Sequence, residues 1–241
     1  MTRFGFPRRH FRATESTNDL ARELAERGAP AGTVVTADAQ TAGRGRHGRA
    51  WTTPPRKALL YSAILRPLDA GHALLPLAVP LAVCEAVESL APVRCEIKWP
   101  NDVWLDERKL AGVLIEARPP DWAVIGIGVN VAIGPDEFPA DLRWPATSIG
   151  RGATPEQVGA GVDRALDEWV DAEFERVLSA YRERDALFGR ELAWTGGESD
   201  GTGRGAGIDE RGNLVVVRDD GKRVALGSGE VQLQLPSSRP R

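Results

Sequence analysis

The chain has 241 residues, a net charge of −3, and 42% apolar against 27% charged residues. This weakly acidic balance excludes the global positive field that nucleic-acid-binding proteins usually carry. No apolar run reaches the ~20 residues of a membrane span and no apolar core follows the basic N-terminal residues, so we expect a cytoplasmic protein without a signal peptide. The two cysteines, Cys84 and Cys95, are too few for a disulfide framework and lack the spacing of a metal-binding pair.

The first three quarters of the chain alternate predicted helices and strands. The first helix has start and stop signals, because Ser16, Thr17 and Asn18 can cap its N-terminus and Gly28 can end it. In chain order, the apolar patterns predict a helix over 14–28, strands over 33–38 and 58–65, a helix over 74–90, a strand over 93–99, a hairpin of strands 103–105 and 110–117, a strand over 122–133, and a long helix over 155–188.

The pattern changes at Gly189, where short apolar alternations and glycine-rich turns replace helical spacing. Residues 214–217 and 223–226 predict strands of a small β-barrel. We therefore expect an α+β fold with two domains, over residues 1–188 and 189–241.

The stretch GRGRHG at residues 43–48 fits the G-x-G-x-x-G pattern of a dinucleotide-binding turn. That pattern requires a helix directly after the glycines, and Pro54-Pro55 leaves no room for one. Three arginines in the segment, Arg44, Arg46 and Arg49, are also unusual for a turn that binds phosphate through backbone amides. Arginine is suited to paired contacts with phosphate or carboxylate, so we interpret residues 40–51, the arginine loop, as a flexible anion-binding loop. The alternatives are a solvated loop or a short nucleic-acid contact.

Two lysines lie at strand ends around the predicted hairpin. Lys98 ends one apolar strand and Lys109 begins another, so both cations can face one site. The simpler interpretation is two surface lysines whose aliphatic stems pack on the sheet. Further along, Gly126 and Gly128 interrupt an apolar strand, which indicates close approach by a ligand or a β-bulge.

Several common site types are missing from the sequence. There is no P-loop motif, the three histidines lack zinc-binding spacing, and no Ser-His-Asp set is visible. A site rich in Arg and Lys and poor in nucleophiles suits a reaction in which the substrates supply the nucleophile and the protein neutralises anions.

Taken in order, these clusters resemble the biotin protein ligases, and the resemblance covers nearly the whole chain. The matching segments are ESTN (15–18), QTAGRGRHGRAW (40–51), KWPND (98–102), RKLAGVL (108–114), GIGVNV (126–131), ATSI (146–149), and GID with GNLV (207–215). The resemblance implies a class II synthetase-like catalytic domain of the biotin–lipoate ligase type, a mixed β-sheet with helices, followed by a small SH3-like β-barrel. It also implies a form without the DNA-binding domain of some relatives, because ESTN comes within the first twenty residues. We therefore expect no DNA binding.

The implied activity is ATP-dependent biotinylation in two steps. Biotin and ATP with Mg²⁺ form biotinyl-5′-AMP, and a lysine of the biotin carboxyl carrier protein domain of an acyl-CoA carboxylase then takes the biotinyl group. Two anions must approach each other in the first step, which requires cations in a partly dry site. A mobile loop that covers the reactive adenylate would protect it from water.

The resemblance also implies site residues. The expected biotin contacts are Ser16, Thr17, Asn18, Gln40, Arg44, Gly45, Arg46 and Lys109. The expected ATP and adenylate contacts are Arg44, Arg46, Arg49, Trp51, Lys98, Asn130 and Trp144. The expected catalytic residues are Lys109 as the main cation, Arg44, Arg46, Lys98, and Asp102 to orient or deprotonate the incoming lysine. The Mg²⁺ ligands are left open.

Two other functions compete with this one. A lipoate-type ligase or octanoyltransferase would share the fold but needs a more apolar tunnel, whereas Ser16, Thr17 and Gln40 suit the ureido ring of biotin. A non-enzymatic binder of biotin or nucleic acid would need fewer cations. The sequence leaves open whether the protein is a monomer or a homodimer, since exposed strands could pair between protomers or with the carrier protein.

Overall fold

The fold is built on a seven-stranded mixed sheet. The computed structural model describes residues 3–142, 144–150, 152–195, 200–227 and 230–233. The strand order is β1-β2-β3-β7-β6-β5-β4, in which only the pairing of β1 with β2 is parallel. The strands are β1 (Arg8–Phe11), β2 (Val34–Ala37), β3 (Ala58–Leu65), β4 (Glu96–Lys98), β5 (Asp102–Leu105), β6 (Arg108–Arg118) and β7 (Trp122–Asn130).

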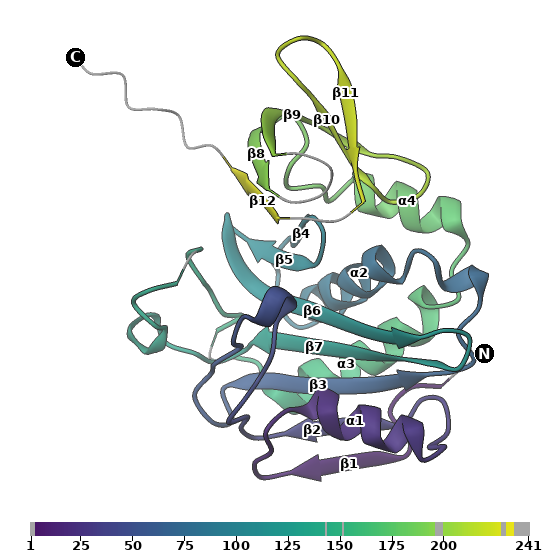
Figure 1. Cartoon of the computed structure of the whole chain (residues 1–241). Helices are drawn as coiled ribbons and strands as arrows, with labels where there is room; N and C mark the ends of the chain where they lie inside the picture. The colour runs from purple at the N-terminus through teal and green to yellow at the C-terminus, as the bar shows by residue number, and fades with distance from the viewer. Residues whose placement is uncertain (1–2, 143, 151, 196–199, 228–229, 234–241) are drawn as a thin grey trace.

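Helices cover both faces of this sheet (Figure 1). The short helix α1 (Thr17–Glu26) places Ala21 and Ala25 against one face, where they meet Val35 and Ile64. The helices α2 (Leu75–Glu88), α3 (Pro155–Trp169) and α4 (Phe174–Arg182) belong to the larger core on the other face. Because side chains alternate along a strand, a strand covered on both sides is apolar throughout, and all eight residues of β3 are buried.

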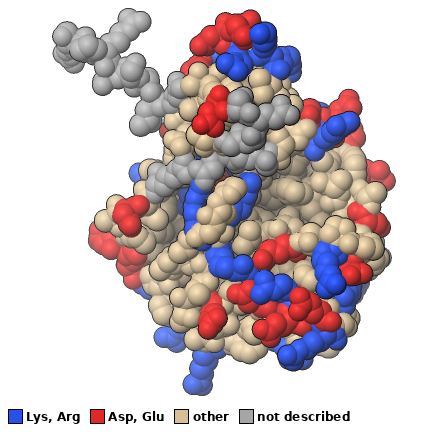
Figure 2. Space-filling view, viewed as in Figure 1, with Lys and Arg blue, Asp and Glu red and all other residues tan. Residues whose placement is uncertain are grey.

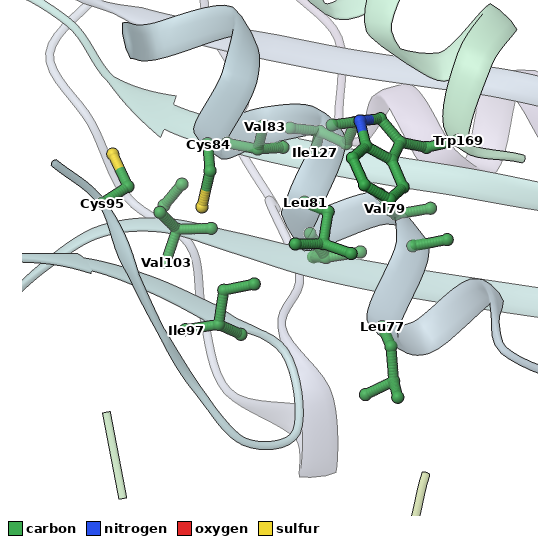
Figure 3. Close-up of a cluster of buried hydrophobic side chains, with 14 of the residues drawn as sticks. Leu77, Val79, Leu81, Val83, Cys84, Cys95, Ile97, Val103, Ile127 and Trp169 are labelled. Carbon is green, nitrogen blue, oxygen red and sulfur yellow. The ribbon is translucent and has the colours of Figure 1, made fainter. Parts of the chain in front are cut away.

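The larger core lies between α2 and the far strands of the sheet. Figure 3 shows Leu81 and Cys84 of α2 beside Ile97 of β4 and Val103 of β5. These buried contacts fix the position of β4 and β5, which carry Lys98 and Asp102 at their adjoining ends.

A second, five-stranded sheet forms the C-terminal part, and all its strands are antiparallel. Its order is β11-β10-β9-β8-β12, from β8 (Glu191–Thr195), β9 (Gly201–Ile208), β10 (Leu214–Val217), β11 (Arg223–Leu226) and β12 (Glu230–Leu233). Its side chains Leu192 and Trp194 join the same apolar cluster as the first sheet, and Trp99 Nε1 donates to the Gly212 carbonyl at 3.1 Å. The division into domains at 188 and 189 therefore stays a prediction.

The structure confirms the α+β class and most predicted elements; in the C-terminal sheet it adds β8, β9 and β12 to the two predicted strands, and in the first sheet and its helices it differs in two places. The predicted helix over 155–188 is wrong, because the chain breaks between α3 and α4. The intervening residues 170–173 contain neither glycine nor proline, so the sequence gave no signal of a break. Strand β1 was not predicted, since its sequence RRHF is mostly polar and it is an exposed edge strand. Among the described residues, no helix is both long and apolar enough to cross a membrane.

Candidate active site

A pocket opens where the start of α1, the arginine loop, the β4–β6 hairpins and the middle of β7 meet. Figure 2 shows Lys and Arg side chains near the middle of this face, where the surface is hollowed. The lining residues include thirteen of the predicted site residues: Ser16, Thr17, Asn18, Gln40, Arg44, Gly45, Arg46, Arg49, Trp51, Lys98, Asp102, Lys109 and Trp144. Segments more than a hundred residues apart in the sequence thus form one site.

One end of the pocket is neutral and closely hydrogen-bonded. The Thr17 amide and hydroxyl both donate to Gln40 Oε1, at 2.7 and 3.0 Å. Ser62 Oγ donates to Asn18 Oδ1 at 2.6 Å and lies 2.8 Å from Thr17 Oγ1. The Asn18 amide is therefore oriented, since its Nδ2 donates to Glu116 Oε2 at 2.7 Å. We call this set the neutral end: Ser16, Thr17, Asn18, Gln40 and Ser62.

Glycine in β7 makes room for the neutral end. A Cβ atom at Gly126 would lie 2.2 Å from Asn18 Oδ1, which no side chain tolerates. A Cβ atom at Gly128 would lie 2.5 Å from the Trp51 ring in the same way. The two glycines that suggested a ligand approach or a bulge thus allow Asn18 and Trp51 to pack directly on the strand.

The other end of the pocket is cationic. Lys109 Nζ lies 2.7 Å from Asp102 Oδ1 and 5.5 Å from the centre of the Trp51 ring. Lys98 Nζ faces two indoles, 5.3 Å from the Trp144 ring centre and 5.8 Å from that of Trp104. We call this set the cationic end: Arg46, Lys98, Asp102 and Lys109, with the three tryptophans around it.

Burial and mutual repulsion both destabilise the positive charges of the cationic end when no ligand is bound. Burial lowers the pKa of Arg46, an effect that Asp102 opposes and Arg49 reinforces. Apart from Arg44, which pairs with Asp19 and Glu116, four arginines and lysines among the described lining residues stand against one carboxylate, that of Asp102. An anionic ligand would offset this excess of positive charge, and each charge-assisted contact would be stronger than a neutral hydrogen bond.

Two predicted site residues have unexpected surroundings. Arg44 turns from the cationic end toward carboxylates, with its Nη2 atom 2.7 Å from Asp19 Oδ1 and 3.1 Å from Glu116 Oε2. Asn130 is buried but is not among the lining residues, and its Nδ2 donates to the carbonyl of Thr147 at 3.0 Å. Its amide thus holds the segment after Trp144 in place, and its contact with a nucleotide stays a prediction.

The sequence interpretation missed Ser62, Trp104 and Glu116. Ser62 had a usable signal, since it is the one hydroxyl residue without an aromatic ring in the apolar strand ALLYSAIL. Glu116 had none, because its contact with Asn18 and Arg44 depends on a register that only the fold sets.

The mixed sheet, the helix α1 beside it and the two-ended pocket are features of one class of protein. Residues 10–130 match the model of the biotin/lipoate A/B protein ligase family, and the chain belongs to that family. More particularly, residues 194–234 match the biotin protein ligase C terminal domain.

Relatives and solved structures agree with this assignment. The chain is 33% identical to the biotin–[acetyl-CoA-carboxylase] ligase of Mycobacterium tuberculosis, over 90% of this chain and 85% of that protein. It is 40% identical to the bifunctional ligase/repressor BirA of Bacillus subtilis over 157 residues, so the match spans less than half, 46%, of that relative. The biotin protein ligase of Aquifex aeolicus, solved with biotin and ATP, superposes with a TM-score of 0.82 at 28% identity, covering 95% of this chain and all of that one.

Proposed function

We propose that the protein is an ATP-dependent biotin protein ligase, which activates biotin as biotinyl-5′-AMP and transfers it to a lysine of a carrier protein. The observation that carries this proposal is the two-ended pocket. Neutral donors and acceptors around Thr17 lie at one end, and the Lys109–Asp102 pair with its neighbouring cations lies at the other. The relatives named above support the same activity.

The neutral end would take the ureido ring of biotin. That ring has two N–H donors and one carbonyl acceptor, and hydroxyl and amide side chains can match them. A lipoyl chain offers no such polar head, so it would leave the remaining hydrogen-bonding positions of these side chains buried without partners, at a cost of about 1–3 kcal/mol each. This favours biotin over the lipoate-type alternative, which the family also includes.

The cationic end would carry the first half-reaction. A biotin carboxylate oxygen held near Lys109 bonds to the α-phosphorus of ATP, and the bond from that phosphorus to the bridging β-phosphate oxygen breaks, releasing pyrophosphate. Lys109, Lys98 and Arg46 neutralise the two anions as they approach. Mg²⁺ would be bound largely by the ATP phosphates and would neutralise part of their charge.

The second half-reaction would use the same end of the pocket. The amine of the acceptor lysine attacks the acyl carbon of the mixed anhydride, AMP leaves, and the amine loses its proton. We infer that Asp102 receives or directs that proton, and the 2.7 Å contact between its Oδ1 atom and the Lys109 ammonium supports a role close to the reacting groups. We propose a biotin carboxyl carrier domain of an acyl-CoA carboxylase as the acceptor, as the name of the Mycobacterium tuberculosis relative suggests. The two free cysteines, both buried, fit a reducing cytoplasmic location.

The experiment is exchange of labelled pyrophosphate into ATP, measured with biotin, with lipoate and with neither acid. Exchange that depends on biotin supports the adenylation step. Exchange with lipoate alone would replace the substrate, and absence of exchange with either acid in folded protein containing Mg²⁺ would refute the ligase activity.

A further inference from the structure

We propose that Arg44 is a latch, and not an anion-binding residue of the pocket. In this role it holds the arginine loop closed by bridging Asp19 of α1 and Glu116 of β6. The consequence of closure, retention of the adenylate in the pocket, rests on the proposed function. Closure of the loop itself can be tested without any substrate.

The arginine loop is a narrow hairpin whose two arms bond to each other. The Gly45 amide donates to the Arg49 carbonyl at 2.7 Å, and the Trp51 amide donates to the Gly43 carbonyl at 2.8 Å. These bonds shape the hairpin, but they do not fix its angle to the sheet. Contacts from the hairpin to other elements must do that.

Arg44 makes such contacts. Its Nη2 atom donates to Asp19 Oδ1 at 2.7 Å and lies 3.1 Å from both carboxylate oxygens of Glu116. Asp19 belongs to α1 and Glu116 to β6, so one guanidinium joins the loop to two elements of the rigid sheet layer.

The local charges show why Arg44 is a poor anion site. Arg22 also faces these acids, 2.8 Å from Asp19 and 3.8 Å from Glu116, so two cations stand against two carboxylates. An approaching carboxylate or phosphate would meet a neutral cluster. Arg46, on the same hairpin, is in the opposite situation, because it is partly buried and its side chain faces Asn101 at 3.5 Å.

Glu116 also connects the latch to the neutral end. Its Oε2 atom accepts from Asn18 Nδ2 at 2.7 Å and from Arg44. A ligand that orders Asn18 would therefore favour the position of Glu116 that Arg44 needs. Loop closure and biotin binding are expected to be coupled through this carboxylate.

The first test is limited tryptic cleavage after Arg46 and Arg49 in the protein without substrates, followed by mass spectrometry. A protease needs an extended chain, so cleavage reports opening of the hairpin. Partly exposed ion pairs are weak, so we expect roughly two- to fivefold faster cleavage in Asp19→Asn and Glu116→Gln, and up to about tenfold in Arg44→Gln. Arg22→Gln is the matched control, since Arg22 touches the same acids but is outside the loop. Its cleavage rate should equal that of the wild type.

The second test measures adenylate retention, by transfer of biotin to the lysines of added serum albumin relative to pyrophosphate exchange. Arg44→Gln should raise this transfer several-fold while exchange falls much less than in Lys109→Ala. Glu116→Gln keeps an acceptor for Asn18 and should raise the KM for biotin less than Glu116→Ala, which removes the acceptor as well as the charge.

The outcomes separate the two proposals. Unchanged cleavage in Asp19→Asn and Glu116→Gln, or equal acceleration in Arg22→Gln, would overturn the latch. Loss of exchange in Arg44→Gln as large as in Lys109→Ala would also overturn it, because Arg44 would then contact the reacting anions. If the wild type shows no exchange at all, the ligase proposal fails while the cleavage result still decides the latch.

Discussion

The neutral and cationic ends of the pocket differ in how their polar groups are satisfied. At the neutral end Thr17, Asn18 and Ser62 are buried, uncharged and bonded to one another or to Gln40. At the cationic end Lys109 and Asp102 form a pair within an excess of positive charge. The first end is oriented by these bonds before a ligand arrives, and its remaining hydrogen-bonding positions can select a ligand. The second is completed by an anion, which is the condition for stabilising charge that develops during a reaction.

Removing the Lys109 cation should have the largest effect on the contrast between the two ends. We expect Lys109→Ala to lower biotin-dependent pyrophosphate exchange about 10²–10³-fold, the typical loss when one preorganised charge-stabilising donor is removed. The KM for biotin should change much less, because the neutral end is intact. The measurement is exchange across a range of biotin concentrations.

The control is Lys57→Ala, since Lys57 pairs with Glu137 away from the pocket, at 2.6 Å. A second variant, Lys109→Gln, keeps a polar group beside buried Asp102 in case the alanine variant is unstable. Exchange within threefold of the wild type in both folded variants would show that Lys109 has no part in adenylation.

Filling the neutral end should have the next largest effect. A Cβ atom at Gly126 would overlap Asn18 Oδ1, so Gly126→Ala must displace the amide, and we expect roughly ten- to hundredfold weaker biotin binding, as for overpacking that costs about 1–3 kcal/mol. The matched variant is Gly152→Ala, outside the pocket lining, where no atom would lie within 4 Å of the new Cβ. Calorimetric titration with biotin compares the two, and equal affinities would show that Asn18 does not shape the biotin site.

Ser62→Ala tests the hydrogen bonds of the same end without adding volume. The change leaves Asn18 Oδ1 without its donor, and an unsatisfied buried acceptor costs about 1 kcal/mol or more, so we expect about fivefold higher KM for biotin. The KM for ATP should stay constant, because Ser62 is far from the cationic end in the hydrogen-bond network. Ser89→Ala, which removes a hydroxyl at the end of α2, should change neither value. An equal rise in both KM values would mean that the two ends are not separable.

The sequence predicted which residues lie at the two ends of the pocket, but not which side chains contact one another there. The motifs around Thr17, Arg46 and Lys109 were sufficient to predict that these residues line the pocket, because the polar residues of each motif lie within a short segment. Ser62, Glu116 and the orientation of Arg44 depend on which strands are neighbours, and no local pattern shows that β3 and β6 flank β7. The break between α3 and α4 could not be predicted either, because residues 170–173 include no glycine or proline.

Asp185 contrasts with Asp102, because its residue is half-buried and its carboxylate forms no ion pair with a described lysine or arginine. Burial raises the pKa of Asp185 to about 6, with the nearby Glu96 carboxylate adding to the effect, while amide donation from Leu187 at 2.8 Å opposes it. Its Oδ2 atom is buried without a hydrogen-bond partner among the described residues. The folded state therefore binds this proton more tightly than the unfolded chain, whose aspartate pKa is about 3.9.

The stability contributed by the protonated form is complete below about pH 4 and is lost as the pH rises through about 6. Asp185→Asn keeps an acceptor for the Leu187 amide and removes the charge, so it should stabilise the protein by about 2 kcal/mol at pH 8 and by almost nothing near pH 4. Urea unfolding at both pH values measures this, with Asp121→Asn, an exposed carboxylate, as the control that should show no such difference. A gain of equal size at both pH values would mean that the ionised carboxylate is not what the fold disfavours. Pyrophosphate exchange should be unchanged, because Asp185 is outside the pocket lining and its charge affects the stability of the fold, not the reaction.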